Sequence, residues 1–390
     1  MKFLHISDLH IGKRLHERSF LEDQKYILEE ILSIAKEQKA DALLLAGDIY
    51  DKNVPTEKGV MLFDEFLTEC KRAAIKVFLI SGNHDSSERI HFGGRIMEES
   101  GIYIQGRFEG KLSPIRLEDK YGSYHVYLLP FVRPALVKPY LKEETENVQE
   151  QLSYHMAVQK VLEEVEKDDA ATNILVAHQF VMAGGMEPER CESESISVGG
   201  LDNVDVSVFA GFDYVALGHL HMSQQVGKEN VYYSGSPLKY SFSEAEVKGG
   251  KIPEKSVLLV TAENGISIQK IPLKPLRDMR VLRGRLEDLL KPEVYEKANT
   301  EDYVRVVLTD EEELYEPMRR LRKVYPNILR LDFDNSRTRT KEGVAMSAEA
   351  VEEKSAVELF GEFYENQNKN PLSNEQSEVI KKIWQEVTGQ

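Results

Sequence analysis

The chain has 390 residues, which is long enough for two or three domains, the first of them large enough to bury a full core. Its formal net charge of −16 argues against a protein that coats DNA through a basic face, but it leaves phosphoester chemistry open if metal ions or a basic partner supply a positive field. No apolar run could span a bilayer, the N-terminus lacks a secretory signal, and the only two cysteines lie far apart, so we expect a cytoplasmic protein without membrane attachment.

The first half of the chain alternates short apolar runs with helical patterns. Helices are predicted over residues 19–38, where Ser19 and Glu22 have the spacing of a capping box, and over residues 56–73. Asn264-Gly265 marks a later hairpin turn. Strands are predicted over residues 2–7, 41–48, 75–82, 172–179 and 214–221, with further β structure at 231–244 and 255–271. Continuous apolar strands separated by helices predict a largely parallel sheet that is covered on both faces.

The alternation of predicted strands and helices ends at residues 272–276, a stretch that contains two prolines. We therefore expect a first domain over residues 1–274, a small α+β module over 275–338, and a linker with a helical tail over 339–390. The two helical patterns of the tail cover residues 356–367 and 374–387. Because the tail is too short to hold a core, its apolar stripe is either folded back on the body or offered to a partner. The stripe comprises Val357, Leu359, Phe360, Phe363 and Tyr364.

Five short motifs carry most of the chemical information, and each follows or ends a predicted strand. They are Asp8-Leu-His10, Gly47-Asp48-Ile-Tyr-Asp51, Gly82-Asn83-His84-Asp85, Ala177-His178 and Gly218-His219-Leu-His221. Taken singly, a histidine or a carboxylate after a strand is commonly structural. Because ligand sites of α/β sheets collect at the carboxyl ends of the strands, we expect the five loops to converge on one metal site.

The spacing within the motifs fits a pair of metal ions. Residues i and i+2 of an extended chain point to the same side, so His219 and His221 can each reach a different ion of a pair about 3.5–4 Å apart. Asp8 and His10 can share one ion if their strand curls at its end, and Asp48, with two oxygens, suits a bridging position. Carboxylate and amide oxygens mixed with imidazoles, without a thiolate, favour manganese or iron, with magnesium as a further alternative. Such ions would acidify a water for attack on phosphorus and offset the charge of the phosphate.

In its order of motifs the chain resembles the calcineurin-like metallophosphoesterases. More narrowly, it is similar to the SbcD-type nuclease subunits, the bacterial counterpart of the double-strand-break repair nuclease. The similarity is carried by the stretches "HISDLHIGKRLHE", "LLLAGDIYD", "FLISGNHDS", "LVAHQF", "YVALGHLH" and "YSGSPLKYSFSE". It runs over nearly the whole chain, through the small module and the tail stretch "ELFGEFYENQNKNPLSNEQ".

This resemblance implies a four-layer α/β/β/α sandwich for residues 1–274 and a capping domain that helps to position DNA for residues 275–338. Residues 339–390 would include the helices that bind SbcC, an ABC-type ATPase, and the chain would form a homodimer within a heterotetramer. The implied ligands are Asp8, His10, Asp48 and His221 for one metal, and Asp48, Asn83, His178 and His219 for the other. His84 would stand beside the scissile phosphate, and Asp85 would orient it.

Several further residues near the motifs are candidates for supporting roles. Some relatives carry a histidine at the position of Asp51, so we expect Asp51 either behind the ligands or as a partner of His84. His5 lies within a strand and is interpreted as a core residue or as a contact behind the ligands, in preference to the alternative that it is itself a metal ligand. Seven residues are candidate DNA contacts, with solvated charge as an equal alternative: Lys13, Arg14, His16, Arg89, Arg133, Lys239 and Tyr240. The acidic, glycine-bounded stretch 184–200 is predicted to form a mobile loop.

We therefore expect a two-metal, manganese-dependent DNA phosphodiesterase, an exonuclease on double-stranded ends and an endonuclease on single-stranded or hairpin DNA. With the SbcC-type ATPase it would serve DNA repair, recombination and replication at the nucleoid. One alternative is a small-molecule or phosphoprotein phosphoesterase, which would need neither the small module nor the tail. The other is a DNA-end-binding scaffold without catalysis, against which the complete set of ligand positions argues.

Overall fold

The computed structural model describes residues 1–141, 152–194, 202–227, 230–247, 252–336, 338, 358–361, 364 and 372–388. The chain divides into two compact units. The first comprises Met1–Val281 and Glu301–Tyr303, and the second comprises Leu282–Thr300 and the residues from Val304 onward. Along the described residues, no helix is long and apolar enough to cross a membrane.

Six strands form the first sheet of the first unit, in the order β16-β15-β1-β4-β5-β6. Their bounds are β1 Lys2–Ile6, β4 Ala42–Ala46, β5 Lys76–Ile80, β6 Ile102–Gln105, β15 Ser256–Ala262 and β16 Ile266–Pro272. β1, β4, β5 and β6 run parallel, whereas β15 and β16 join antiparallel at one edge. The predicted hairpin is confirmed, because Asn264 and Gly265 connect β15 to β16 and both have positive φ.

A second six-stranded sheet has the order β13-β14-β12-β9-β8-β7. Its strands are β7 Ile115–Asp119, β8 Gly122–Leu129, β9 Thr172–His178, β12 Tyr214–Gly218, β13 Gln224–Gln225 and β14 Val231–Tyr233. The four central strands are parallel, and the short edge strands β7 and β13 pair antiparallel. β9 and β12, which carry two of the predicted motifs, are therefore neighbours in the middle of this sheet.

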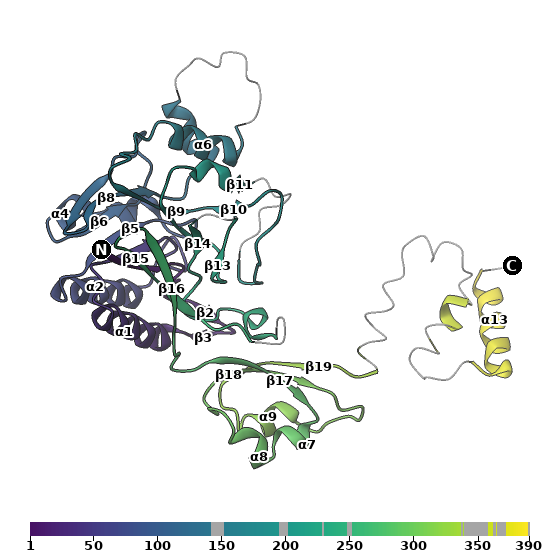
Figure 1. Ribbon diagram of the computed structural model, residues 1–390. Coiled ribbons are helices and arrows are strands. Elements are labelled where there is room, and N and C mark those ends of the chain that lie inside the picture. The colour runs from purple at the N-terminus through teal and green to yellow at the C-terminus, as the bar shows by residue number, and fades with distance from the viewer. Residues whose placement is uncertain are drawn as a thin grey trace. The chain divides into compact units, whose positions relative to one another are not determined.

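The two sheets pack face to face in the first unit (Figure 1). Apolar side chains from both sheets form one buried cluster between them. Leu44 and Phe78 of the first sheet share one buried cluster with Val126, Val176 and Ala216 of the second. Because strands buried on both faces need apolar residues at every position, this packing explains the continuous apolar runs of the sequence.

Helices cover the outer faces of both sheets. α1 (Leu21–Glu37) and α2 (Glu57–Arg72) lie side by side on the first sheet, and α6 (Tyr154–Glu163) packs on the second. The predicted four-layer α/β/β/α sandwich is thus confirmed. The predicted capping box of α1 is wrong, because Phe20 occupies the N-cap position and stacks its buried ring on Tyr303.

Short elements connect these layers, and only part of the stretch 231–244 is β structure. After β14 the chain forms a turn and ends this stretch in a 3-10 helix, η3. The short elements are β2 Arg14–Leu15, β3 Arg18–Ser19, α3 Ser87–His91, α4 Gly94–Glu98, α5 Pro134–Val137, η1 Lys138–Tyr140, β10 Phe180–Met182, β11 Asn203–Asp205, η2 Val206–Phe209 and η3 Phe242–Ala245.

The second unit contains a small core of its own and most of a three-stranded sheet in the order β17-β18-β19, of which β17 and β18 begin in the first unit. Its elements are β17 Met279–Gly284, α7 Leu286–Leu289, α8 Pro292–Tyr295, β18 Tyr303–Leu308, α9 Pro317–Leu321, β19 Ile328–Phe333 and α13 Asn374–Thr388. The core includes Val306, Leu321 and Tyr325. α13 coincides with the second helical pattern predicted for the tail. Val357, Phe363 and most of the predicted linker and first tail helix lie outside the described residues.

Candidate metal centre

All five predicted motifs lie where strands of the two sheets end, and the fold brings them together. β1, β4 and β5 of the first sheet and β9 and β12 of the second each end at one of these motifs. Backbone hydrogen bonds join the loops, from Asp8 N to the Gly47 carbonyl at 3.1 Å and from His10 N to the Asp48 carbonyl at 3.0 Å. His178 and Gly218 are register partners in the second sheet. The expected convergence therefore comes from the carboxyl ends of strands in two sheets that pack face to face.

The chain curls sharply as it leaves these strands. Asp8 (φ 54°), His10 (φ 44°), Asp48 (φ 50°) and His219 (φ 108°) all have positive φ, which is uncommon for residues other than glycine. Such backbone conformations cost about 1–3 kcal/mol each and persist where the surrounding structure enforces them, as at functional sites. The curl after β1 is what aims the side chains of both Asp8 and His10 at the same place.

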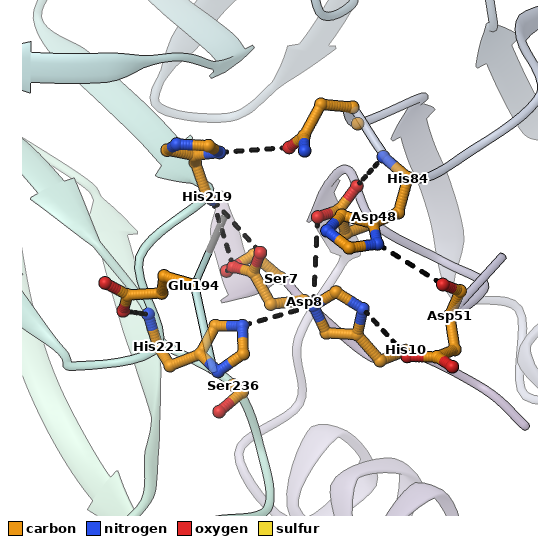
Figure 2. Close-up of polar contacts among 12 residues, drawn as sticks. Ser7, Asp8, His10, Asp48, Asp51, His84, Glu194, His219, His221 and Ser236 are labelled. Carbon is orange, nitrogen blue, oxygen red and sulfur yellow. Dashed lines mark hydrogen bonds and ion pairs between the residues drawn. The ribbon is translucent and has the colours of Figure 1, made fainter. Parts of the chain in front are cut away.

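The first donor group consists of Asp8, His10 and His221. One ligand atom from each lies within 4.8 Å of the others, and all three side chains are buried. The Nε2 atoms of His10 and His221 are 3.1 Å apart, and Figure 2 shows the two rings facing each other. Burial holds the pKa of His10 well below its ordinary value, so its imidazole is neutral and offers a lone pair. Two nitrogens and a carboxylate oxygen that converge in this way fit a single cation.

The second donor group consists of Asp8, Asp48 and His178, again within 4.8 Å of one another. Asn83 Oδ1 lies 3.0 Å from both His178 Nε2 and His219 Nδ1, so the amide and the second histidine adjoin this group. His178 Nδ1 donates to the Ala46 carbonyl at 2.7 Å, which directs Nε2 to the site.

Asp48, a member of the second group, lies between His178 of that group and His10 of the first group. Its Oδ2 is 3.7 Å from His10 Nε2 and 3.5 Å from His178 Nε2. Burial alone would raise the pKa of Asp48, but the surrounding imidazoles more than offset it and hold the pKa well below its ordinary range. Burial would likewise lower the pKa of His178, yet the carboxylates of Asp48 and Asp8 raise it to about 9. Asp48 and His178 therefore form a carboxylate–imidazolium pair, and a cation held by this group would take the place of the proton on His178 Nε2.

Two motif glycines are required by the closeness of these loops. A Cβ atom on Gly82 would lie 2.1 Å from Asp48 Oδ1. One on Gly47, which has φ of 83°, would lie 2.4 Å from His178 Nδ1. Each distance is far below a van der Waals contact, so only glycine allows the carboxylate and the imidazole to reach their positions.

His84 and Asp85 lie beside the donor groups, but they are not paired as expected. The His84 backbone N–H donates to Asp48 Oδ1 at 2.9 Å, and its Nδ1 donates to the Asp51 carbonyl at 3.2 Å. The Asp85 carboxylate accepts from the backbone N–H groups of Ile49, Tyr50 and Gly82 at 2.9–3.0 Å. The expectation that Asp85 orients His84 is therefore corrected: Asp85 holds two motif loops together, and the Asp51 carbonyl binds the imidazole.

Asp51 and His5 lie behind the donor groups. The Asp51 carboxylate pairs with Lys13 Nζ at 2.8 Å and lies 4.0 Å from His10 Nδ1. His5 is fully buried between the sheets, where its Nε2 donates to the Leu217 carbonyl and its Nδ1 accepts from the Tyr214 hydroxyl. Burial lowers the pKa of His5 to about 3, so this ring is a neutral core residue.

The candidate DNA contacts differ in how far their side chains are exposed. Arg14, His16, Arg89 and Arg133 have exposed side chains, and Lys13 is partly buried in its ion pair with Asp51. For Lys239 and Tyr240 the prediction of a DNA contact is wrong, because both are buried. Lys239 Nζ pairs with Asp278 at 2.9 Å, and the Tyr240 hydroxyl donates to the Leu9 carbonyl at 2.5 Å. Tyr240 therefore stabilises the backbone of the Asp8-Leu-His10 motif.

Several polar residues that support the site were missing from the sequence prediction. Gln24, on the buried face of α1, donates to the His10 carbonyl at 2.7 Å. Glu194, in the stretch predicted to be a mobile loop, is buried and accepts from the His221 backbone N–H at 2.7 Å. Of that stretch, residues 195–200 lie outside the described residues. The Ser-x-x-Glu pattern of Ser241 and Glu244 was a usable signal, since it forms a capping box that places Glu244 near His221.

Comparisons with known proteins agree with this site. Residues 1–223 match the family described as calcineurin-like phosphoesterase, and residues 275–368 match the type 5 capsule protein repressor C-terminal domain. The chain belongs to the calcineurin-like phosphoesterases and is a metal-dependent phosphoester hydrolase. The SbcD subunit of the SbcCD nuclease from Staphylococcus epidermidis is 31% identical over 392 residues, which cover 98% of each chain. Within the phosphoesterases, this places the chain among the SbcD-type nuclease subunits.

Two solved structures were also compared. A dimetal phosphatase from Danio rerio is 12% identical with a TM-score of 0.42, and the match covers 71% of this chain and 98% of the phosphatase. A protein of Thermus thermophilus is 14% identical with a TM-score of 0.38, covering 69% and 98%. Both TM-scores lie below 0.5.

Proposed function

We propose that the chain is a two-metal DNA phosphodiesterase that prefers manganese. The observation that carries this proposal is the pair of buried donor groups that share Asp8, with Asp48 between them. One ion would be held by Asp8, His10, Asp48 and His221, and the other by Asp48, Asn83, His178 and His219. These donors are carboxylate, amide and imidazole groups without a thiolate, which suits manganese or iron. When bound, two such ions supply an acidified water and positive charge for the phosphate.

His84 is proposed as the residue that meets the scissile phosphate. Because the Asp51 carbonyl only accepts, His84 Nδ1 carries a proton, and this hydrogen bond fixes the orientation of the ring. Beside the donor groups, the other ring nitrogen, Nε2, would face a bound phosphate, and when it carries a proton it can donate to a phosphate oxygen and offset charge that builds there during hydrolysis. Since its backbone also bonds Asp48, His84 is held in a fixed relation to the proposed bridging ligand.

DNA as the substrate rests on the similarity to a nuclease subunit over 98% of both chains. We infer exonuclease activity on double-stranded ends and endonuclease activity on single-stranded or hairpin DNA, in repair, recombination and replication. In this proposal residues 1–274 form the nuclease domain, 275–338 position DNA, and 339–390 include the partner-binding tail. The two buried cysteines, Cys70 and Cys191, are consistent with a proposed cytoplasmic location.

An SbcC-type ATPase is the proposed partner, within a heterotetramer that contains two copies of this chain. α13 presents Val379, Ile383 and Trp384, whose side chains are about half exposed at 54%, 51% and 47%. Apolar residues exposed at helical spacing are the anchors with which an amphipathic helix binds a groove. These exposed apolar side chains support the alternative in which the tail binds a partner protein instead of folding back on the body of the chain.

A substrate comparison tests the proposal. The full chain is incubated with Mn²⁺ and either end-labelled hairpin and single-stranded DNA or a small phosphodiester, with EDTA as the control. We expect Mn²⁺-dependent cleavage of the DNA. Rapid turnover of small phosphoesters with intact DNA would favour the small-molecule or phosphoprotein phosphoesterase, and no turnover of any substrate would favour a DNA-end-binding scaffold.

A further inference from the structure

Three of the four polar atoms of His221 are held by partners that are not proposed ligands. Its backbone N–H donates to Glu194 Oε1 at 2.7 Å, and its carbonyl accepts from Lys255 Nζ at 2.7 Å. Its Nδ1 lies 2.8 Å from the Ser193 hydroxyl. The remaining atom, Nε2, faces His10 Nε2. With the residue 2% exposed, these contacts fix the position of the ring and turn Nε2 toward His10. Figure 2 shows the contact of His221 with Glu194 and its ring facing His10.

The direction of the hydrogen bond between Ser193 and His221 follows from a third residue. The Ser193 hydroxyl lies 2.9 Å from Glu244 Oε1, which also accepts from the backbone N–H groups of Tyr240 and Ser241. Glu244 is fully buried, and its other oxygen pairs with Lys255 Nζ at 2.6 Å, which keeps the carboxylate ionised. An ionised carboxylate only accepts, so Ser193 donates its proton to Glu244.

Since its proton is committed to Glu244, the Ser193 oxygen can only accept from His221. His221 Nδ1 must therefore carry a hydrogen, and in the neutral ring Nε2 then has the lone pair. His219 lies two residues away and faces Asn83 through the opposite nitrogen, Nδ1. As metal ligands, His219 would offer Nδ1 and His221 would offer Nε2, so the two histidines of one Gly-His-x-His motif would need different tautomers when they bind metal. The spacing of the motif cannot set this difference.

We propose that Ser193 and Glu244 are positioning residues that fix the tautomer of His221 for metal binding. This inference rests on the proposed two-metal function and assigns a role to a segment, 191–194, that sequence analysis left as an acidic loop. The segment is tied to His221 twice, by the Ser193 hydroxyl and by the Glu194 carboxylate. Partners behind a metal-binding histidine typically change metal affinity 10- to 100-fold when they are removed, which sets the expected size of the effect at about this range.

The test is calorimetric titration of Mn²⁺ into the full chain after EDTA treatment and dialysis. It compares the unaltered protein with Ser193→Ala, with Ser193→Thr, which keeps the hydroxyl, and with Ser153→Ala. Ser153 is the matched control, because its hydroxyl caps α6 away from the donor groups and its removal costs stability alone. We expect Ser193→Ala to weaken one of the two Mn²⁺ binding events by about 10- to 100-fold while sparing the other. Ser193→Thr should restore it.

A failure of the role of Ser193 and a failure of the two-metal function would give different results. If Ser193→Ala lowers the melting temperature as Ser153→Ala does but leaves the Mn²⁺ titration unchanged, Ser193 is merely structural and the inference is overturned. If the unaltered protein itself binds no Mn²⁺, the proposed two-metal function fails, and the role of Ser193 fails with it. Glu244→Gln keeps the shape of the side chain but removes its negative charge. It should weaken the same Mn²⁺ binding event as Ser193→Ala. An effect on the other binding event would contradict the proposed chain of hydrogen bonds from His221 through Ser193 to Glu244.

Discussion

His10 and His221 are 211 positions apart in the chain, yet their Nε2 atoms lie 3.1 Å apart in a buried position. His10 follows a strand of the first sheet, and His221 follows a strand of the second. The donor group they form with Asp8 therefore exists only when the two sheets are packed together. A cation in this group would cross-link the sandwich at the ends of its strands.

Removal of metal should for that reason lower stability as well as activity. With Mn²⁺ at about 100 times its dissociation constant, a ligand that binds only the folded state adds about 2.7 kcal/mol to the free energy of unfolding. We expect EDTA to lower the melting temperature measured by calorimetry and Mn²⁺ to restore it. Asp48→Asn, which removes the charge between the two groups, should lose most of this Mn²⁺ effect. If the unaltered protein has the same melting temperature in EDTA and in Mn²⁺, a metal ion does not link the two sheets.

Asp85 should matter for the architecture of the loops. Asp85→Asn replaces one acceptor oxygen by an amide N–H, which faces a backbone donor from Ile49, Tyr50 or Gly82. Each buried N–H group left without a partner costs about 1–3 kcal/mol, so urea unfolding should show a loss of that size. Asp205→Asn is the matched control, since Asp205 caps a short helix where asparagine serves equally well. Equal stability of the two variants would argue against this role.

The tail should be needed for the partner and dispensable for basal cleavage. Deletion of residues 347–390 is expected to abolish co-purification with the SbcC-type ATPase while the Mn²⁺-dependent activity remains. A finer variant changes Val379, Ile383 and Trp384 to alanine, and its control changes the exposed polar residues Glu378, Lys381 and Lys382 of the same helix. Unchanged co-purification of the deleted chain, or equal loss in both triple variants, would contradict the assignment.

Cys70 should be unreactive in the folded protein. It is fully buried, and burial raises the pKa of its thiol to about 12. Because the thiolate is the reactive form, only about one thiol in ten thousand would be ionised at pH 8, and reactivity should rise only near that pKa or on unfolding. Alkylation by iodoacetamide, followed by peptide mass spectrometry, should label Cys70 in urea and spare it in buffer. Comparable labelling in both would show that the core around α2 is open.

The convergence of the site residues that directly follow apolar strands could be predicted from the sequence. Asp8, Asp48 and His178 could be predicted to meet because continuous apolar strands imply an α/β sheet whose carboxyl ends converge. Ser193 and Glu244 could not, since each reaches His221 from an irregular segment whose path depends on tertiary packing. Tyr240 was misplaced for the same reason. Outside a regular helix or strand no periodicity tells a buried side chain from an exposed one.

His84 provides the most direct test of the account, through Mn²⁺ titration and single-turnover cleavage of hairpin DNA on the same preparation. Its ring is held by the Asp51 carbonyl, and it is not among the proposed ligands. His155→Ala is the control, a partly buried histidine with one backbone hydrogen bond, from Asp205. We expect His84→Ala to bind Mn²⁺ as the unaltered protein does and to cleave DNA at least about 100-fold more slowly. Cleavage at the unaltered rate, or a loss of cleavage that follows entirely from lost Mn²⁺ binding, would contradict the account.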